Sequence, residues 1–349
     1  MRIVFMGTPA FAVPSLRRLL EDGHTVPLVV TQADKPAGRG HTLTAPPVKQ
    51  FAIEQGLQFY QPVTLKDDES FAVLSAAKPE LIVVVAYGKL LPARVLALPE
   101  NGCINVHASL LPKYRGAAPI QWAVMNGERE TGVTTQRMAA AMDTGDILLQ
   151  SKRAIPPDAT SGDMFELLAA DGAALLSRTL AENPEPIPQD AALATYAPPL
   201  TKALCPLDFS HPAAELHNRV RGLAPFLTAI CQYGEEIWKV WETRVAGDSA
   251  AVMIKPPIIQ TVAGSIGAAP AQTVADIKAP ASVAQNTSAA AQTDAALPIG
   301  AIVNLTPLTV ACGGGTALEL RVLQAPDKPK RAGEEFARGK RLQIGDRLR

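Results

Sequence analysis

Two polar side chains stand two residues apart at the end of a short apolar segment, and both suit chemistry at a carbonyl carbon. Asn105 and His107 alternate with apolar residues in a strand predicted over residues 102–107, so both side chains lie on one face of it. An amide can donate to the oxyanion that forms when a carbonyl is attacked, and an imidazole can donate to it or relay a proton. The pair therefore indicates acyl transfer.

A carboxylate farther along the chain is a candidate third member of this group. Asp143 lies in the segment Met142-Asp-Thr-Gly-Asp146, which is expected to form a turn from which the carboxylate reaches His107 and orients the ring. Asp146 competes for the same role, and Asp143 also suits an Asx turn. Asn and His at a strand end are often only turn or capping groups. Taken singly, the residues leave the catalytic and the structural interpretation open.

The nearest thiol is an unsuitable nucleophile on geometric grounds. Cys103 precedes His107 by four strand residues, which separate them by about 13 Å, beyond hydrogen-bond reach. Cys103 is therefore predicted to be a core residue. The four cysteines of the chain form no CxxC pair, so neither a disulfide framework nor a zinc or other metal site is expected.

The elements that must position these residues follow an alternating pattern over the first 200 residues. Residues 81–85 are apolar at every position, as in a central parallel strand that is covered on both faces. The pattern predicts a Rossmann-like, doubly wound, mostly parallel α/β sheet with its site at the carboxyl ends of the strands. The predicted strands are 2–6, 26–31, 57–61, 81–86 and 102–107, and the predicted helices are one starting at Pro14, 48–55, 69–77 and 161–180.

The rest of the chain divides into a linker and a second domain. A catalytic domain is expected over 1–182, a Pro-rich linker over 183–203 and a smaller β-rich domain over 204–349, with strands at 237–243, 301–303 and 318–323. Residues 261–297 consist largely of Ala, Pro, Ser, Thr, Gln and Val. This composition predicts a poorly ordered, low-complexity insertion, because it lacks the large apolar side chains that pack a core.

Composition restricts the class of protein. The 349 residues carry 33 Lys plus Arg against 33 Asp plus Glu, so a simple RNA-coating protein is disfavoured and any RNA contact must come from local clusters. The chain has no apolar run of about 18 residues and no charged-then-apolar N-terminal pattern, so neither a membrane span nor a signal peptide is predicted. A cytoplasmic location is expected.

Three motifs together resemble the signature of the folate-dependent formyltransferases. They are Asn105-x-His107, the segment Ser-Leu-Leu-Pro-Lys-Tyr-Arg-Gly-Ala-Ala-Pro-Ile at 109–120, and Asp143-Thr-Gly-Asp146. The resemblance implies that Asn105, His107 and Asp143 are the catalytic triad, with 10-formyltetrahydrofolate as co-substrate and no metal. It also implies a folate pocket formed largely by backbone groups of Val85, Ala86, Tyr87, Gly88, Lys89, Leu90, Leu91, Ser109, Leu110, Leu111 and Pro112.

Further features resemble the branch of this family whose acceptor is initiator tRNA charged with methionine. They are the opening Phe-Met-Gly-Thr-Pro-Ala-Phe-Ala at 5–12, the Gly/Pro-rich loop at 31–49, and a C-terminal domain where this branch carries an OB-like barrel. The implied reaction is formylation of the methionine α-amino group for translation initiation, by a monomer. The expected tRNA contacts are basic residues of the loop, with Arg39 as the main one, and of the basic C-terminal tail: Lys35, Arg39, Lys49, Arg338, Lys340 and Arg341.

Four other readings compete with this one. A formyltransferase for a sugar amine or a purine precursor needs no basic second domain, and a formyltetrahydrofolate hydrolase needs neither that domain nor the loop. An RNA-binding module on an inert scaffold leaves the grouped Asn, His and Asp unexplained. A nucleotide-dependent dehydrogenase is excluded, because Gly7-Thr-Pro-Ala lacks the GxGxxG fingerprint after the first strand.

Overall fold

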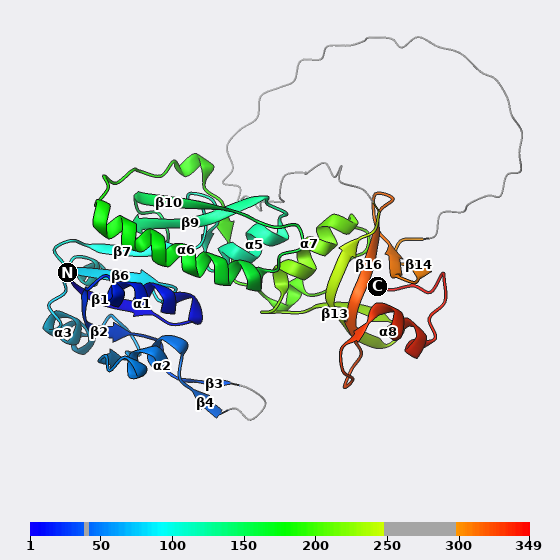
Figure 1. Ribbon diagram of the computed structural model, residues 1–349, viewed down its shortest axis with the longest axis horizontal. Helices are drawn as coiled ribbons and strands as arrows, with labels where there is room; N and C mark the ends of the chain where they lie inside the picture. The colour runs from blue at the N-terminus through cyan, green and yellow to red at the C-terminus, as the bar shows by residue number, and fades with distance from the viewer. Residues whose placement is uncertain (38–41, 248–297) are drawn as a thin grey trace, which may run out of the picture.

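The computed structural model describes residues 1–37, 42–247 and 298–349. Its two parts are an α/β domain that contains the N-terminus and a β domain that contains the C-terminus, and they meet at α7 (Figure 1). The low-complexity insertion predicted at 261–297 lies outside the described residues.

The first domain is organised around a seven-stranded sheet of order β10-β9-β7-β6-β1-β2-β5. Strands β5, β2, β1, β6 and β7 pair in parallel, whereas β9 and β10 extend the sheet antiparallel beyond β7. The predicted mostly parallel sheet is thereby confirmed, and β6 is buried at every position. The strands are β1 (Arg2–Gly7), β2 (Thr25–Val30), β5 (Phe59–Tyr60), β6 (Leu81–Val85), β7 (Cys103–His107), β9 (Glu130–Arg137) and β10 (Ile147–Ala154).

Helices cover both faces of this sheet, because the central strands carry apolar side chains on both faces. Ile3 and Phe5 face one core, with residues of α1, α2, α5 and α6, whereas Val4 and Met6 face the other, with residues of α3 and α4. Helix α6 starts with a capping box between Thr160 and Asp163. The helices are η1 (Ala10–Ala12), α1 (Val13–Glu21), α2 (Pro47–Glu54), α3 (Asp68–Ala76), α4 (Ala93–Leu96), α5 (Pro119–Met125) and α6 (Ser161–Glu182).

The second domain is the predicted small β-rich one. Its antiparallel sheet has the order β12-β13-β16-β15-β14, with β17 paired to β16, and Trp238 packs in its core between Tyr233 and Phe336. The elements are α7 (Ala213–Leu223), β12 (Ala229–Tyr233), β13 (Glu236–Val245), β14 (Ile302–Leu305), β15 (Leu308–Ala311), β16 (Ala317–Gln324), β17 (Arg331–Ala332) and α8 (Gly333–Lys340). Strands occur at all three predicted places in this domain.

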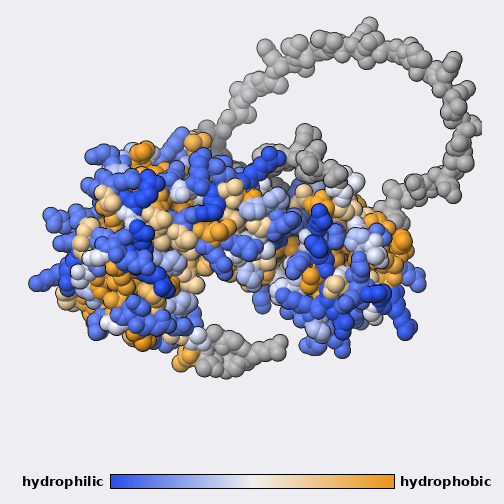
Figure 2. Space-filling view, in the orientation of Figure 1, coloured by the Kyte–Doolittle hydropathy of each residue, from blue (hydrophilic) through white to orange (hydrophobic). Residues whose placement is uncertain are grey.

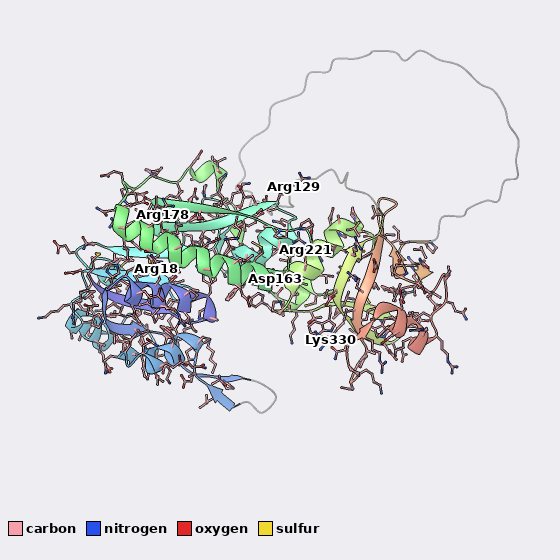
Figure 3. All side chains as sticks on the ribbon, viewed as in Figure 1. Arg18, Arg129, Asp163, Arg178, Arg221 and Lys330 are labelled. Carbon is pink, nitrogen blue, oxygen red and sulfur yellow. The ribbon has the colours of Figure 1, made fainter. Side chains whose placement is uncertain are left out.

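The two domains pack through helices rather than through the sheets. Helix α7 lies against α5, and a side chain at Gly222 would collide with Met125. The Arg221 guanidinium donates to Ala159 O at 2.9 Å across this junction (Figure 3), and its burial lowers the pKa of Arg221 to about 10. A buried cation with a backbone acceptor fixes where α7 sits on the first domain.

The segment that connects the domains lies along the first domain. It contains η2 (Ala191–Leu193), β11 (Tyr196–Ala197) and η3 (Lys202–Leu204), and β11 pairs in parallel with β8 (Arg115–Gly116). Ile187 and Ile147 exchange two backbone hydrogen bonds of 2.8 Å. Residues 187–198 therefore belong structurally to the first domain.

The hairpin of β3 (Lys35–Ala37) and β4 (Thr42–Thr44) projects from the edge of the first domain on the side of α2 (Figure 1). Its base is held by Asp34, which accepts from Lys49 Nζ at 2.8 and 2.9 Å and from Gln61 Nε2 at 2.8 Å. These two donors, Lys49 first, lower the pKa of Asp34. The carboxylate is thus ionised at neutral pH and ties the hairpin to α2.

Candidate active site

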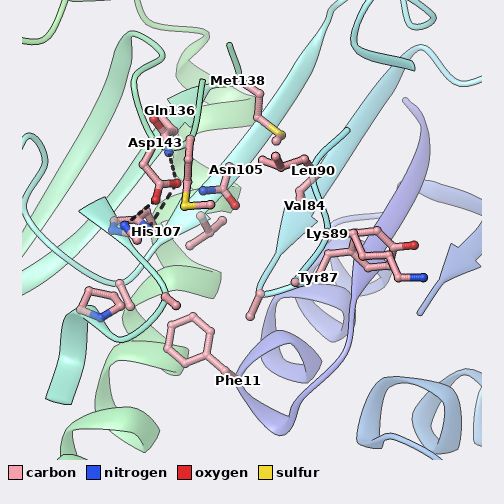
Figure 4. A pocket seen from close by; sticks show the side chains of 18 of the residues that line it. Phe11, Val84, Tyr87, Lys89, Leu90, Asn105, His107, Gln136, Met138 and Asp143 are labelled. Carbon is pink, nitrogen blue, oxygen red and sulfur yellow. Dashed lines mark hydrogen bonds and ion pairs between the residues drawn. The ribbon is translucent and has the colours of Figure 1, made fainter. Parts of the chain in front are cut away.

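A cavity of about 540 Å³ opens at the carboxyl ends of β6 and β7 (Figure 4). Its wall combines the loop after β6, the end of β7, the start of α5 and the loop between β9 and β10. Phe11 and Phe165 complete it from η1 and α6. Asn105, His107 and Asp143 all line this cavity, so the structure brings the three predicted catalytic residues together.

The orientation of His107 is set by a backbone carbonyl. Its Nε2 lies 2.9 Å from Tyr114 O. Because a carbonyl oxygen only accepts hydrogen bonds, the proton of this pair must lie on Nε2. The other ring nitrogen, Nδ1, lies 3.7 Å from Asp143 Oδ1 (Figure 4). Nδ1 is therefore the atom of the ring that can exchange a proton or donate within the cavity.

The hydrogen-bond partners of the Asp143 carboxylate hold this residue in a strained backbone conformation. Its φ of +53° lies in the left-handed region, which Asp tolerates better than most residues. Oδ2 accepts from Gly116 N at 2.8 Å, and Oδ1 accepts from Gln136 Nε2 at 3.2 Å. Of the two carboxylates left open by the sequence, Asp143 is the one that lines the cavity, and Asp146 does not.

Gly116 is a position that only glycine can occupy. Its φ is +115°, and a Cβ there would approach Ala197 O at 2.8 Å. The same residue supplies the N–H that Asp143 accepts. The glycine therefore lets the 115–118 loop pass between the connecting segment and the Asp143 carboxylate.

Asn105 is half-buried and sits in the sheet between Val84 of β6 and Gln136 of β9. Within the described part of the chain its side-chain amide has no protein hydrogen-bond partner, in contrast to the fully engaged Gln136. Figure 4 shows the Asn105 amide facing the same space as His107 and Asp143. Its N–H groups are thus available to a ligand's carbonyl oxygen.

Six of the predicted folate residues line the cavity, as the loop after β6: Ala86, Tyr87, Gly88, Lys89, Leu90 and Leu91. Thr8 Oγ1 and Gln32 Nε2 donate to Tyr87 O and hold this loop. Burial raises the pKa of the Tyr87 phenol to about 12, so it is neutral. The Lys89 ammonium donates to Pro62 O and Val63 O, away from Asn105 and His107. Val85 is buried in β6 behind the cavity wall.

The other predicted folate residues, Ser109, Leu110, Leu111 and Pro112, do not line the cavity. They form the turn that carries the chain from His107 to Tyr114. Thr134 Oγ1 donates to Ser109 O at 2.6 Å and accepts from Leu111 N at 3.1 Å. The Leu111–Pro112 peptide bond is cis. The segment lies outside the cavity lining, and contact of these four residues with folate stays a prediction.

The predicted tRNA contacts lie in different surroundings. Lys35 Nζ donates to Gln32 Oε1, and Lys49 forms an ion pair with Asp34. Lys340 pairs with Glu236 and lies 5.8 Å from the Trp238 ring centroid. Arg338 and Arg341 are exposed, whereas Arg39 lies outside the described residues.

The surface around α8 is mostly hydrophilic (Figure 2). On the lower edge of this domain, Lys330 stacks over Trp241 with its Nζ 3.3 Å from the ring centroid (Figure 3). An ammonium over the face of an indole ring forms a cation–π contact, which holds this lysine side chain against the domain.

Several site residues have no assignment from sequence reasoning. Gln136 is one, because its place beside Asn105 depends on the antiparallel pairing of β9 with β7. Gly116 carries a detectable signal, since an Arg-Gly dipeptide inside a Pro-rich loop suggests an unusual backbone. Phe11 and Phe165 meet edge to face, with ring centroids 5.2 Å apart. The two residues are 154 positions apart in the sequence, so no local pattern reveals their contact.

The described residues also bear on the expectations for metal ligands, cysteines and membrane spans. No group of three or more His, Cys, Asp or Glu side chains there is placed to hold a metal ion. The four cysteines are free and buried, and burial raises the pKa of Cys103 to about 12. The prediction of Cys103 as a core residue is confirmed. None of the described helices has the length and apolar character of a membrane span.

Comparison with known proteins agrees with this geometry. Residues 1–180 match the model of the formyl transferase family, and residues 199–341 match that of the formyl transferase C-terminal domain. The chain belongs to the formyl transferase family. Among curated relatives it is 51% identical over 254 residues to the methionyl-tRNA formyltransferase of Moorella thermoacetica, which covers 72% of this chain and 82% of the relative. It is 53% identical over 231 residues to that of Acidobacterium capsulatum, covering 65% and 74%.

Solved structures show the same fold at low sequence identity. WlaRD, a sugar 3N-formyl transferase determined with dTDP and 5-N-formyl-THF, matches with a TM-score of 0.57 and 16% identity over 94% of this chain and 98% of that chain. The N-formyltransferase of Helicobacter canadensis, in complex with folinic acid and dTDP-3-aminofucose, gives 0.55 and 17% over 70% and 88%. Both comparisons support the fold assignment.

Proposed function

We propose that this protein transfers the formyl group of 10-formyltetrahydrofolate to the α-amino group of methionine on initiator tRNA. The observation that carries the proposal is the gathering of Asn105, His107 and Asp143 around one cavity beside the loop 86–91. The relatives named methionyl-tRNA formyltransferase, which are 51% and 53% identical to this chain over the matched residues, support this acceptor.

The reaction that these residues would support is direct acyl transfer. The uncharged methionyl amine attacks the formyl carbon, the bond from that carbon to N10 breaks, and a proton moves from the amine to N10. Asn105 donates from its side-chain amide to the formyl oxygen as negative charge develops there. The backbone of Asn105 is held in the sheet between β6 and β9, which limits the positions that its side-chain amide can take.

His107 supplies the second interaction with the formyl oxygen or with the migrating proton. Since Tyr114 O engages Nε2, only Nδ1 can take part. Asp143 keeps the ring oriented and offsets the positive charge of the imidazolium. Gly116 and Gln136 hold that carboxylate in place.

An apolar wall of the cavity suits the methionine side chain. Phe11 lies at the end of the cavity away from Leu90 and Met138 (Figure 4), and it meets Phe165 edge to face. Pro119 and Ile120 extend this wall. If folate occupies the loop 86–91, the thioether side chain of the acceptor packs here, where sulfur–aromatic contacts are favourable.

Replacing Phe165 with Ala tests this placement. The variant is expected to lower kcat/KM for methionyl-tRNA about 10-fold, because one large apolar contact to the acceptor is lost, with the KM for folate unchanged. Leu167→Ala is the matched control, since Leu167 is on the same helix and 39% exposed. An equal loss of kcat/KM for Phe165→Ala with folate as the varied substrate would show that the ring contacts folate rather than the acceptor.

The proposed function itself is tested by formyl transfer from 10-formyltetrahydrofolate to initiator tRNA carrying methionine. We expect formylmethionine to form on the charged tRNA and no transfer to free methionine or to a nucleotide-linked amino sugar. Release of formate at the same rate without tRNA would indicate a hydrolase. Formylation of the sugar amine in preference to the tRNA would overturn the acceptor.

The basic residues proposed to bind tRNA are Lys35, Arg39, Lys49, Arg338, Lys340 and Arg341. Arg338 and Arg341 support this most directly, as exposed cations near the end of α8. Lys49 and Lys340 would have to contact the tRNA while they remain paired with Asp34 and Glu236. Salt-dependent binding of the tRNA is the general expectation for such contacts.

A further inference from the structure

The segment that connects the two domains carries a residue whose side chain reaches the catalytic loop. We infer that Gln189 is a positioning residue for formyl transfer, because its amide holds the turn that bears Asp143. This inference rests on the proposed function only through the reaction used to measure it.

The Gln189 amide is engaged at both ends. Its Nε2 donates to Asp143 O at 2.9 Å and to Gly145 O at 2.7 Å. Its Oε1 accepts from Arg115 Nη2 at 2.7 Å and from Arg115 Nε at 3.1 Å. Arg115 is 6% exposed. One half-buried amide therefore joins the catalytic turn to a buried cation on the loop that follows β7.

The two carbonyls to which Gln189 donates belong to a turn with an unusual conformation. Asp143 has a φ of +53°, and a side chain at Gly145 would collide with Arg137 O. The carbonyls of this turn accept from Gln189, whereas the Asp143 carboxylate contacts Gly116, Gln136 and His107. By holding the carbonyls, Gln189 directs the carboxylate toward His107 and Gly116.

The same connecting segment also supports the partner of His107. Thr195 Oγ1 accepts from Tyr114 N at 2.8 Å, and Thr195 O accepts from Arg115 N at 2.8 Å. Ala197 O accepts from Ala117 N at 2.9 Å. These bonds fix the stretch whose carbonyl, Tyr114 O, accepts from His107. Both groups that orient the His107 ring thus depend on the connecting segment.

The chemistry of the side chain provides a discriminating substitution. A glutamate at this position keeps two oxygens for Arg115 but has no N–H for Asp143 O and Gly145 O. Gln189→Glu therefore preserves the partner of the buried guanidinium while placing a carboxylate against two carbonyls. Gln189→Met removes both interactions without adding charge.

The experiment compares Gln189→Glu and Gln189→Met with Gln232→Glu, a control in which an exposed amide also donates to a backbone carbonyl, that of Gly234. We expect both Gln189 variants to lower kcat about 10- to 100-fold, the usual effect of misplacing a catalytic group by an ångström. The KM for each substrate should stay at control values in both variants, and the thermal unfolding temperature should stay there in Gln189→Glu, which keeps an acceptor for Arg115. Gln189→Met leaves the buried guanidinium without that acceptor and should unfold at a lower temperature, so Gln189→Glu is the variant that separates positioning from stability.

A double variant decides whether the effect passes through Asp143. In an Asp143→Asn background, Gln189→Glu should lower kcat by no more than about twofold further, because the positioned carboxylate is already gone. Unchanged kcat in the single variants, or losses that multiply in the double variant, would overturn the inference. Hydrolysis of 10-formyltetrahydrofolate without tRNA gives the same comparison, so Gln189 is tested even if the proposed acceptor is wrong.

Discussion

Replacement of His107 by alanine is expected to lower kcat for formyl transfer by about 10²- to 10⁴-fold, the range for losing a proton-transfer group. His107 is the only residue of the site that combines a ring nitrogen facing the cavity with a partner on each side, Tyr114 and Asp143. Alanine removes the imidazole and leaves Asp143 with Gly116 N and Gln136 Nε2 as its partners. Substrate binding should change little, because the other residues that line the cavity stay in place.

Single-turnover formylation with saturating folate and tRNA measures this effect on chemistry alone. His24→Ala is the control, since His24 contacts the N-terminal amino group at the surface. A His107→Ala enzyme that retains a tenth or more of the wild-type rate would show that Asn105 alone carries the reaction.

Conversion of Asp143 to asparagine is expected to lower kcat at least about 10²-fold while the fold is kept. Asparagine also tolerates a φ of +53°, and its side-chain oxygen can still accept from Gly116 N. The variant removes the negative charge beside His107 Nδ1 and the oxygen that accepts from Gln136 Nε2. A fall in kcat with unchanged thermal unfolding would assign the loss to the ionised carboxylate rather than to the fold.

Asp146→Asn is the matched control for this prediction. The sequence leaves Asp143 and Asp146 as alternatives, and both belong to the same turn. Because the Asp146 side chain does not line the cavity, its neutralisation should leave kcat within about twofold of wild type. The opposite ranking of the two variants would reverse the assignment.

The sequence predicts those parts of the structure that depend on local pattern. The fully apolar segment that became β6 and the alternating Asn105-x-His107 both reflect the two-residue repeat of a strand. Their meeting at one sheet edge follows from parallel pairing alone. The predicted helices 48–55 and 69–77 differ from α2 and α3 by one residue at their ends.

Features that depend on distant partners are beyond local pattern. The strand β9 antiparallel to β7 brings Gln136 beside Asn105, although strand 102–107 gives no sign of an antiparallel neighbour. Lys49 and Lys340 read as free cations in the sequence, yet the fold gives each a carboxylate, Asp34 and Glu236. The sequence also suggests that 183–203 is a spacer, whereas Gln189 and Thr195 are built into the site.

The path of the connecting segment has a consequence for how the enzyme matures during its own synthesis. The last strand of the large sheet, β10, ends at Ala154, so the sheet and its cavity can form before residues 189–198 leave the ribosome. Only then do Gln189, Thr195 and Ala197 reach their partners around Tyr114 and Asp143. A nascent chain ending at the last residue of α6 contains Asn105, His107 and Asp143 but lacks these partners. On our proposal, catalytic competence thus begins after the large sheet of the first domain has already formed.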